Sequence, residues 1–215
     1  MVDEISISPE VEKLGIKTVA ALFANARVSN RSGALEEKKK EIIGTIKDLT
    51  DNPILAAYRE LYKFCNAEEF TPPAVGLIQL GKRNGRLPNI NTVVDSYNLV
   101  SVETLLSIGA HDIDKIKGNL VFKITDGSEL YIPLGSSEPE KVNSGEYACM
   151  DEEKIICRMD VKQCEQTKIT KETKSFIVYI QGNKNTDFDY LVKALDKICK
   201  YITSFCGATL VKKMV

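Results

Sequence analysis

Residues 85–118 read GRLPNINTVVDSYNLVSVETLLSIGAHDIDKIKG and place a helix directly before the only histidine of the chain, His111. Asn91 follows the Leu87-Pro88 break, and a short polar residue at such a place caps the start of a helix. From there apolar residues recur at helical spacing and predict one buried face, made of Val93, Val94, Tyr97, Val100 and Leu105. The stretch therefore predicts an amphipathic helix that leads into the segment carrying the histidine.

Short polar residues form a second stripe on the same helix, at steps of four, three and three. They are Asn91, Asp95, Asn98 and Ser101. Short amides, a carboxylate and a hydroxyl are poor solvating groups compared with Lys and Glu, so we expect them to face groups that need hydrogen bonds. Two interpretations stay open: a buried polar network with capping, or the wall of a ligand pocket.

Three segments carry a resemblance to a known family: LPNINTVVDSYNLVSVETLLSIGAHDIDKI at 87–116, YIPLG at 131–135, and CRMDVKQCEQTKITKETKSFIVYI at 157–180. They resemble the B3/B4 domain, the editing region in the beta subunit of phenylalanyl-tRNA synthetase, and the freestanding proteins built from that domain. The resemblance covers about Pro72 to Gln181. It implies an α+β fold in which a mixed β-sheet is flanked by helices.

The function that the resemblance implies is hydrolysis in trans of a mischarged aminoacyl-tRNA. Its partner would be the charged acceptor end of a tRNA, held transiently, and no cofactor is expected. Because the ester is already reactive, a site has to place it, place a water and polarise the carbonyl. A non-catalytic tRNA- or RNA-binding module and a pocket for a small amino-acid-like ligand remain as alternatives. A complete aminoacyl-tRNA synthetase is not expected in 215 residues.

The resemblance also implies site residues, although the chain departs from the synthetases at two positions. The histidine of the synthetase editing site falls on Gly109, and His111 falls where the synthetases have an aromatic residue. The catalytic candidates are His111, Asp112 and Glu165. The substrate-binding candidates, expected to line one cavity with His111, are Asn91, Asp95, Asn98, Ser101, Gly109, Gln163, Cys164 and Thr167. A structural role for a lone histidine stays open, and tyrosine is not assumed as the discriminated amino acid.

Composition and charge limit the partners. The net charge is −1 and the sequence pI is near 6.0, whereas a protein that holds nucleic acid on its own is usually basic. Any RNA contact should therefore be local and brief, and DNA is not expected as a partner. No apolar run approaches the roughly 20 residues that cross a bilayer, and the first residues do not resemble a signal peptide. The sequence predicts a cytoplasmic protein, and its oligomeric state stays open.

The cysteines and the basic residues each have a structural and a functional interpretation. The six cysteines form no CxxC pair and only one histidine is present, so reduced structural thiols are expected and no metal site. The segment 81–86 is expected to be a loop that is either a solvated surface or a phosphate contact, through Lys82, Arg83 and Arg86. The run 38–40, three lysines, predicts a solvated helix face.

Thr71-Pro72-Pro73 marks the clearest boundary. It suggests an N-terminal strand and helical cap at 1–70 and a B3/B4-like part with a C-terminal helix at 71–215, in one unit. Helices are predicted at 35–49, from 51, at 74–80 and at 186–205, where Phe188 is expected to face inward. The pattern of residues 15–28 fits a strand or a helix, and the resemblance favours a strand. A strand is also predicted at 174–180, with hairpins at 119–134 and 145–159, and an irregular start at 1–14.

Overall fold

The computed structural model describes residues 2–44, 49 and 51–215, and a four-stranded antiparallel sheet lies at its centre. In spatial order its strands are β11 (Thr209–Met214), β2 (Lys17–Ala24), β10 (Phe176–Gly182) and β3 (Ser107–Asp112). The two inner strands read KTVAALFA and FIVYIQG. Such nearly continuous apolar runs are typical of strands that are buried on both faces, so each face of this sheet needs a second layer.

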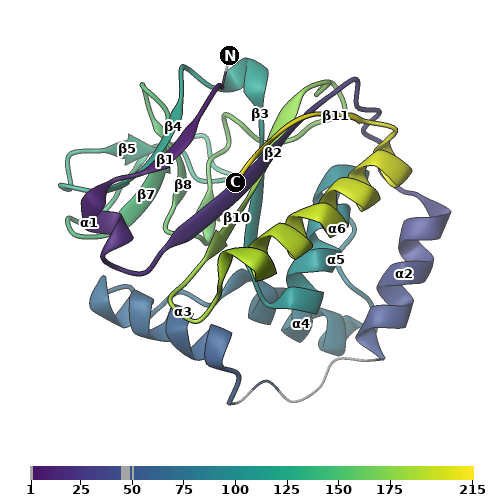
Figure 1. Cartoon of the computed structure of the whole chain (residues 1–215), viewed down its shortest axis with the longest axis horizontal. Coiled ribbons are helices and arrows are strands. Elements are labelled where there is room, and N and C mark those ends of the chain that lie inside the picture. Colours follow the sequence, from purple (N-terminus) through teal and green to yellow (C-terminus); the bar gives the residue numbers. More distant parts are fainter. Residues whose placement is uncertain (1, 45–48, 50) are drawn as a thin grey trace.

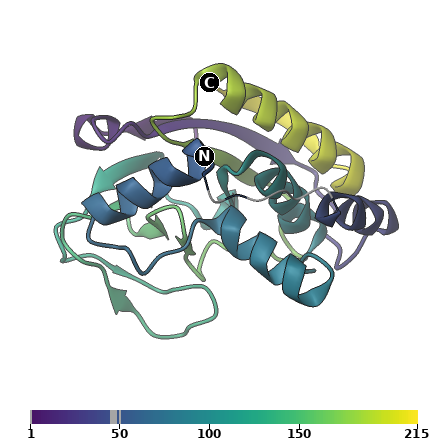
Figure 2. The ribbon, with the colours of Figure 1, turned by 90° about the horizontal axis from the view of Figure 1, so that it is seen from below.

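Helices form the layer on one face of the sheet (Figures 1 and 2). They are α2 (Gly33–Ile43), α4 (Pro73–Asn84), α5 (Thr92–Thr104) and α6 (Phe188–Cys206). The long α6 begins at Asp187, whose side chain accepts a hydrogen bond from the Tyr190 N–H, and ends at Gly207 in the left-handed conformation. A hydrophobic core, which we call the first core, lies between the helices and the central sheet. The inner face of α6 contributes Leu191, Leu195, Ile198 and Ile202 to it.

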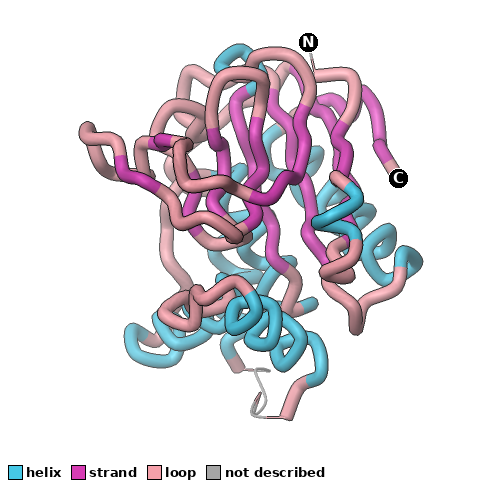
Figure 3. Tube along the Cα trace, turned by 90° about the vertical axis from the view of Figure 1, so that its left-hand side faces the viewer, coloured by secondary structure: helices cyan, strands magenta, loops and turns pink. Residues whose placement is uncertain are grey.

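A second, mixed sheet covers the other face. Its order is β1 (Ile5–Ile7), β4 (Leu120–Ile124), β7 (Tyr147–Met150), β8 (Ile155–Arg158) and β9 (Lys162–Gln163), with β1 parallel to β4. The remaining elements are α1 (Pro9–Glu12), α3 (Pro53–Phe64), η1 (Ile113–Lys115), β5 (Leu130–Tyr131) and β6 (Glu140–Lys141). A second hydrophobic core lies between the two sheets. It contains the aromatic residues Tyr58, Tyr62, Phe122 and Tyr147. Figure 3 shows the strands in the upper part of the view, one group of helices below them and other helices behind and to the right. The predicted α+β class, with a mixed sheet flanked by helices, is confirmed.

Residues 1–70 contribute to both sheets. β2 pairs with β10 on one side and β11 on the other, and β1 extends the second sheet. α3 packs its tyrosines into the second core. The division at residue 70 therefore remains a prediction about where the B3/B4-like part begins, and the N-terminal strands are integral to the sheets.

Several predicted elements hold and several need correction. The strands at 15–28 and 174–180, the hairpin at 145–159 and the C-terminal helix are present. The start of the chain is not irregular, because it forms β1 and α1. The hairpin at 119–134 is wrong, since β4 pairs with β1 and β7 while β5 pairs with β6. Phe188 is 50% exposed, which corrects its inward placement, and part of the helix predicted at 35–49 lies outside the described residues.

Candidate functional site

A cavity of about 400 Å³ lies between α4, α5, β3 and the segment that follows β8. We call it the outer cavity. Its walls are mainly apolar and include Leu77, Leu80, Val94, Tyr97, Ile108 and Ile169. Its polar lining comes from Asn98, Asp160, Gln163 and Lys168. An apolar cavity with a few polar groups is the usual form of a small-molecule site.

Within the polar stripe on α5, Asn98 lines the outer cavity. The other members, Asn91, Asp95 and Ser101, make hydrogen bonds inside the protein. Asn91 accepts hydrogen bonds from the Val93 and Val94 N–H groups at 3.1 and 3.0 Å and donates to the Ile169 carbonyl at 3.3 Å. Ser101 donates to the Leu106 carbonyl at 2.7 Å. The expectation that Asn91 and Ser101 line the cavity is therefore wrong, because both are buried and engaged in capping and backbone bonds.

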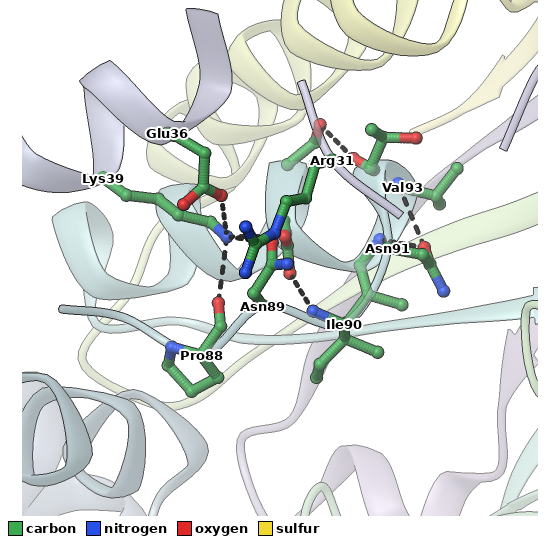
Figure 4. A network of polar contacts seen from close by, with 12 residues as sticks. Arg31, Glu36, Lys39, Pro88, Asn89, Ile90, Asn91 and Val93 are labelled. Carbon is green, nitrogen blue, oxygen red and sulfur yellow. Dashed lines mark hydrogen bonds and ion pairs between the residues drawn. The ribbon is translucent and has the colours of Figure 1, made fainter. Parts of the chain in front are cut away.

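Asp95 takes part in a buried ion pair with Lys39 of α2, and Figure 4 shows Lys39 beside its other partners. Lys39 Nζ lies 2.5 Å from the Asp95 carboxylate and also donates to the Pro88 carbonyl at 2.9 Å and to Asn89 Oδ1 at 3.2 Å. Asp95 in turn accepts the Ile90 N–H at 3.0 Å. Two corrections follow: Lys39 is 4% exposed rather than part of a solvated face, and Asp95 fixes the cavity-lining Ile90 instead of facing the cavity itself.

His111 lies in a buried cluster on the opposite face of β3 from the cavity-lining Ile108 and Ala110. Its Nδ1 is 2.7 Å from Thr167 Oγ1, its ring stacks on Tyr179 with the ring centroids 5.7 Å apart, and Thr167 Oγ1 is 2.9 Å from Cys164 Sγ. Burial lowers the pKa of His111 to about 3, so the ring is neutral at pH 7. The structure brings His111, Cys164 and Thr167 together as predicted, but in the second core and not along the outer cavity.

The two acidic candidates also have structural partners. Asp112 accepts a hydrogen bond from Thr173 Oγ1 at 2.7 Å and caps η1 through the Asp114 N–H at 3.0 Å. The Glu165 side chain is 27% exposed and pairs with Lys168. That pairing, with a bond from the Gly135 N–H, lowers the pKa of Glu165. A lowered pKa makes a carboxylate a weaker base, and neither residue lines the outer cavity.

Gly109 and Gln163 meet at the inner end of the outer cavity. A Cβ built on Gly109 would lie 2.6 Å from Gln163 Nε2 and 3.3 Å from the Tyr179 ring. The space beside the Gly109 backbone is therefore filled by the Gln163 amide and the Tyr179 phenol. Of the predicted binding residues, Gly109 and Gln163 are adjacent, and Gln163 lines the outer cavity.

Below Gln163 lies a second, narrower space, which we call the inner chamber. It has no room for a water molecule, and it is lined by Ser107, Ile108, Gly109, Cys157, Asp160, Gln163, Tyr179 and Gln181. Ile108, Asp160 and Gln163 line both spaces, so the chamber adjoins the outer cavity.

Asp160 is the main residue that the sequence analysis missed. It is buried, and it accepts hydrogen bonds from Tyr62 at 2.9 Å, from Tyr147 at 3.0 Å and from Ser107. Burial raises the pKa of Asp160, and these three hydroxyl donors oppose the shift. Its position within the segment 157–180 was the available signal, but its partners lie in distant parts of the chain.

The basic residues occupy a helix end instead of the predicted loop. α4 continues to Asn84, so Lys82 and Arg83 lie in its last turn, and Gly85 ends the helix with φ 68°. Arg86 follows, and all three basic side chains are exposed. Basic side chains in the last turn of a helix complement its dipole, which gives these residues a structural role as well. Leu80 of the same helix lines the outer cavity.

The fold and the cavity define a two-core α+β domain with a ligand-sized pocket between its helical layer and the edge of its central sheet. The sequence model of the B3/4 domain matches residues 77–207, and the chain belongs to this family. The described residues contain no helix long and apolar enough to cross a membrane, and no cluster of three metal-ligating side chains.

Similar proteins and one solved structure are consistent with this family. The chain is 29% identical over 104 residues to a phenylalanine–tRNA ligase beta subunit of Mycoplasma genitalium, covering 48% of the chain and 13% of that protein. It is 26% identical over 183 residues to the Yersinia pestis beta subunit, covering 81% of the chain and 22% of that protein. An N-terminal fragment of the Pyrococcus horikoshii phenylalanyl-tRNA synthetase beta subunit shares the fold, with TM-score 0.54, 13% identity, and coverage of 96% of this chain and 49% of that one.

Proposed function

We propose that the protein hydrolyses the ester of a mischarged aminoacyl-tRNA in trans, in the cytoplasm. The observation that carries this proposal is the outer cavity, an apolar space of about 400 Å³ with polar groups at Asn98, Gln163 and Lys168. It is large enough for an amino acid side chain. The similarity to beta subunits of phenylalanine–tRNA ligases supports a tRNA-related substrate.

The cavity supplies donors for the ester, while His111 acts from a distance. Gln163 and Lys168 line the cavity, and in this proposal their amide and ammonium polarise a carbonyl that lies there. Asn98 can orient the ester or a water. In this proposal His111 is a positioning residue, because it holds Thr167 and Tyr179 behind Gln163. Asp112 and Glu165 likewise fix η1 and the segment at Gly135.

The charged acceptor end would enter beside exposed basic residues. Lys82 and Arg83 lie in the last turn of the helix that forms one wall of the cavity, Arg86 follows its end, and Lys168 lines the cavity itself. Phosphate contacts from such residues position an RNA without reading its sequence. With a net charge of −1, the protein would hold the tRNA briefly.

The experiment is a release assay on a broad panel of correctly and incorrectly charged tRNAs. We expect the wild type to free one class of mischarged amino acid, and Lys168→Met to slow that release by about 10²-fold, the usual effect of one lost oxyanion donor. Lys171→Met is the matched control, because Lys171 is exposed and lines neither space. If the folded wild type leaves every charged tRNA intact, the deacylase proposal fails.

One observation favours a non-catalytic tRNA-binding module as the second candidate. The only histidine is buried, neutral and off the cavity, so the outer cavity has no imidazole base. In this case uncharged tRNA binds, and replacing Lys82, Arg83 and Arg86 with Ala lowers the slope of affinity against salt by about one per lost phosphate contact. The control is Lys193→Ala with Lys200→Ala on α6, which should leave the slope unchanged. Salt-independent binding of free amino acids instead would support a small-ligand protein.

A further inference from the structure

The inner chamber contains a buried acceptor without a partner. Gln181 is 1% exposed, and its Nε2 donates to Tyr147 Oη at 2.7 Å. Its Oε1 accepts no hydrogen bond in the described part of the chain. Gln181 lines the chamber, so this oxygen is available to a donor placed there. A buried acceptor without a donor destabilises the protein, and a ligand that donates to it would remove that penalty.

The chamber also contains a carboxylate without a counter-ion. Asp160 receives its hydrogen bonds from Tyr62, Tyr147 and Ser107, so all its described donors are hydroxyl groups. Both of its oxygens act as acceptors, the pattern of an ionised carboxylate. No described basic side chain forms an ion pair with it. Of the other buried carboxylates, Asp95, Glu146 and Asp151 each have a Lys or Arg partner. Asp112 accepts from Thr173 Oγ1 and the Asp114 N–H and does not line the chamber.

Gln163 separates this chamber from the outer cavity. Its amide lies beside Gly109 and lines both spaces. As it stands, the chamber is too narrow for a free water molecule, so a guest can enter only if the Gln163 side chain moves. Gln163 is partly exposed and has no hydrogen bond from its side chain in the described residues, so little holds the amide in place.

We propose that the inner chamber is a subsite for a protonated amino group. An ammonium has three N–H donors and a positive charge. Gln181 Oε1 and the Asp160 carboxylate supply acceptors, and Asp160 supplies the compensating charge. The rest of the ligand lies in the outer cavity against Leu77, Tyr97 and Ile108. For a substrate of the proposed deacylase this group would be the α-ammonium of the aminoacyl ester, and to that extent the inference rests on the proposed function.

The test uses small probes that need no tRNA. Hexylamine and 1-hexanol share an apolar tail for the outer cavity and differ in the polar group. Binding to the full chain is followed by NMR through the side-chain amides of Gln163 and Gln181. We expect hexylamine to shift both amides and to bind at least tenfold more tightly than 1-hexanol. Equal binding of the two probes, or shifts confined to the walls of the outer cavity, would overturn the proposal.

Two variants keep the test decisive. Asp160→Asn should reduce hexylamine binding to the level of 1-hexanol. Because this change also alters a buried network, Gln163→Ala provides an independent measurement: it opens the chamber and should strengthen hexylamine binding several-fold. Gln166→Ala is its matched control, since Gln166 is an exposed glutamine three residues away. Unchanged hexylamine binding in Gln163→Ala contradicts the subsite.

The outcomes separate the subsite from the proposed function. Amine binding without release of any amino acid from tRNA leaves the subsite in place and removes the deacylase. Release of amino acid with equal binding of amine and alcohol keeps the deacylase and removes the subsite.

Discussion

Two buried carboxylates lie in the two cores of this protein and are stabilised in different ways. Asp95, on α5 in the helical layer, has a buried lysine at 2.5 Å. Asp160, after β8, has three hydroxyl donors and no described counter-ion. An ion pair neutralises a buried charge, whereas hydroxyl donors solvate the charge without neutralising it. We call the surroundings of Asp95 the helical side and those of Asp160 the strand side. The charge of Asp95 is therefore neutralised by Lys39, whereas no described cation neutralises the charge of Asp160.

The largest effect is expected on the helical side, from Lys39→Met. The change leaves Asp95 as a buried charge without its lysine, and breaking such a pair costs about 3–5 kcal/mol. The free energy of unfolding, measured by urea denaturation, should fall by this amount. Lys40→Met is the matched control, because Lys40 is exposed on the same helix, and it should change stability by less than about 0.5 kcal/mol. A loss as small as that of the control would mean that the pair contributes nothing net.

Tyr62→Phe tests the other carboxylate with a smaller expected loss. It removes one hydroxyl donor from Asp160 and leaves the ring in place, and a hydrogen bond to a charged group contributes about 1.5–3 kcal/mol. Tyr97→Phe is the control, since the described residues include no hydrogen-bond partner for its hydroxyl. Equal unfolding free energies for Tyr62→Phe and wild type would show that Asp160 does not depend on its hydroxyl donors.

His111 adds a pH dependence to the strand side. Burial lowers its pKa from 6.5 to about 3, so the unfolded chain binds a proton between these values and the folded chain does not. The stability contributed by the neutral ring is complete above pH 6.5 and is lost as the pH falls toward 3. From pH 6.5 to pH 5 the expected loss is about 1.5 kcal/mol.

His111→Gln keeps a side chain able to hydrogen-bond Thr167 and removes the titrating ring. Denaturation at several pH values should show a shallower pH dependence of the unfolding free energy in this variant than in the wild type. Parallel curves for the two proteins would place the imidazole in contact with solvent, contrary to the buried cluster.

How much of this was readable from the sequence depends on how far apart the partners lie in the chain. Periodicity was enough for α5, α6 and β10, because those patterns are local. The pattern of β2 also fitted a helix, and the resemblance decided for a strand. The partners of β4 were not readable, since β1 and β7 compete with the adjacent segment for the same edges. Register is set by side-chain packing over long sequence separations, which one sequence does not display.

The candidate site shows the same limit. Of the predicted binding residues, Asn98 and Gln163 line the outer cavity and Gly109 lies beside Gln163, while polarity correctly indicated that Asp95 and Asn91 need hydrogen bonds. Neither the resemblance nor polarity distinguished a residue that faces a cavity from a buried residue that hydrogen-bonds to a residue of the cavity wall. That distinction depends on partners such as Lys39, which is 56 positions from Asp95 and belongs to a run that looked solvated.

The smallest expected effect on stability, and the sharpest test of the strand side, comes from Gly109→Ala. The added Cβ would meet Gln163 Nε2 at 2.6 Å, the free end of a flexible side chain, and the Tyr179 ring at 3.3 Å. Gln163 can therefore swing toward the outer cavity, and stability should change by less than about 1 kcal/mol. Gly182→Ala is the matched control in a neighbouring strand, where the Cβ would meet Leu191 Cδ2 at 2.8 Å and Thr186 Oγ1 at 2.5 Å in the packed core. It should cost about 1–3 kcal/mol. In Gly109→Ala the Gln163 amide resonance should move while the fold is kept. A loss as large as that in Gly182→Ala would show that Gln163 is locked in place and cannot open the inner chamber.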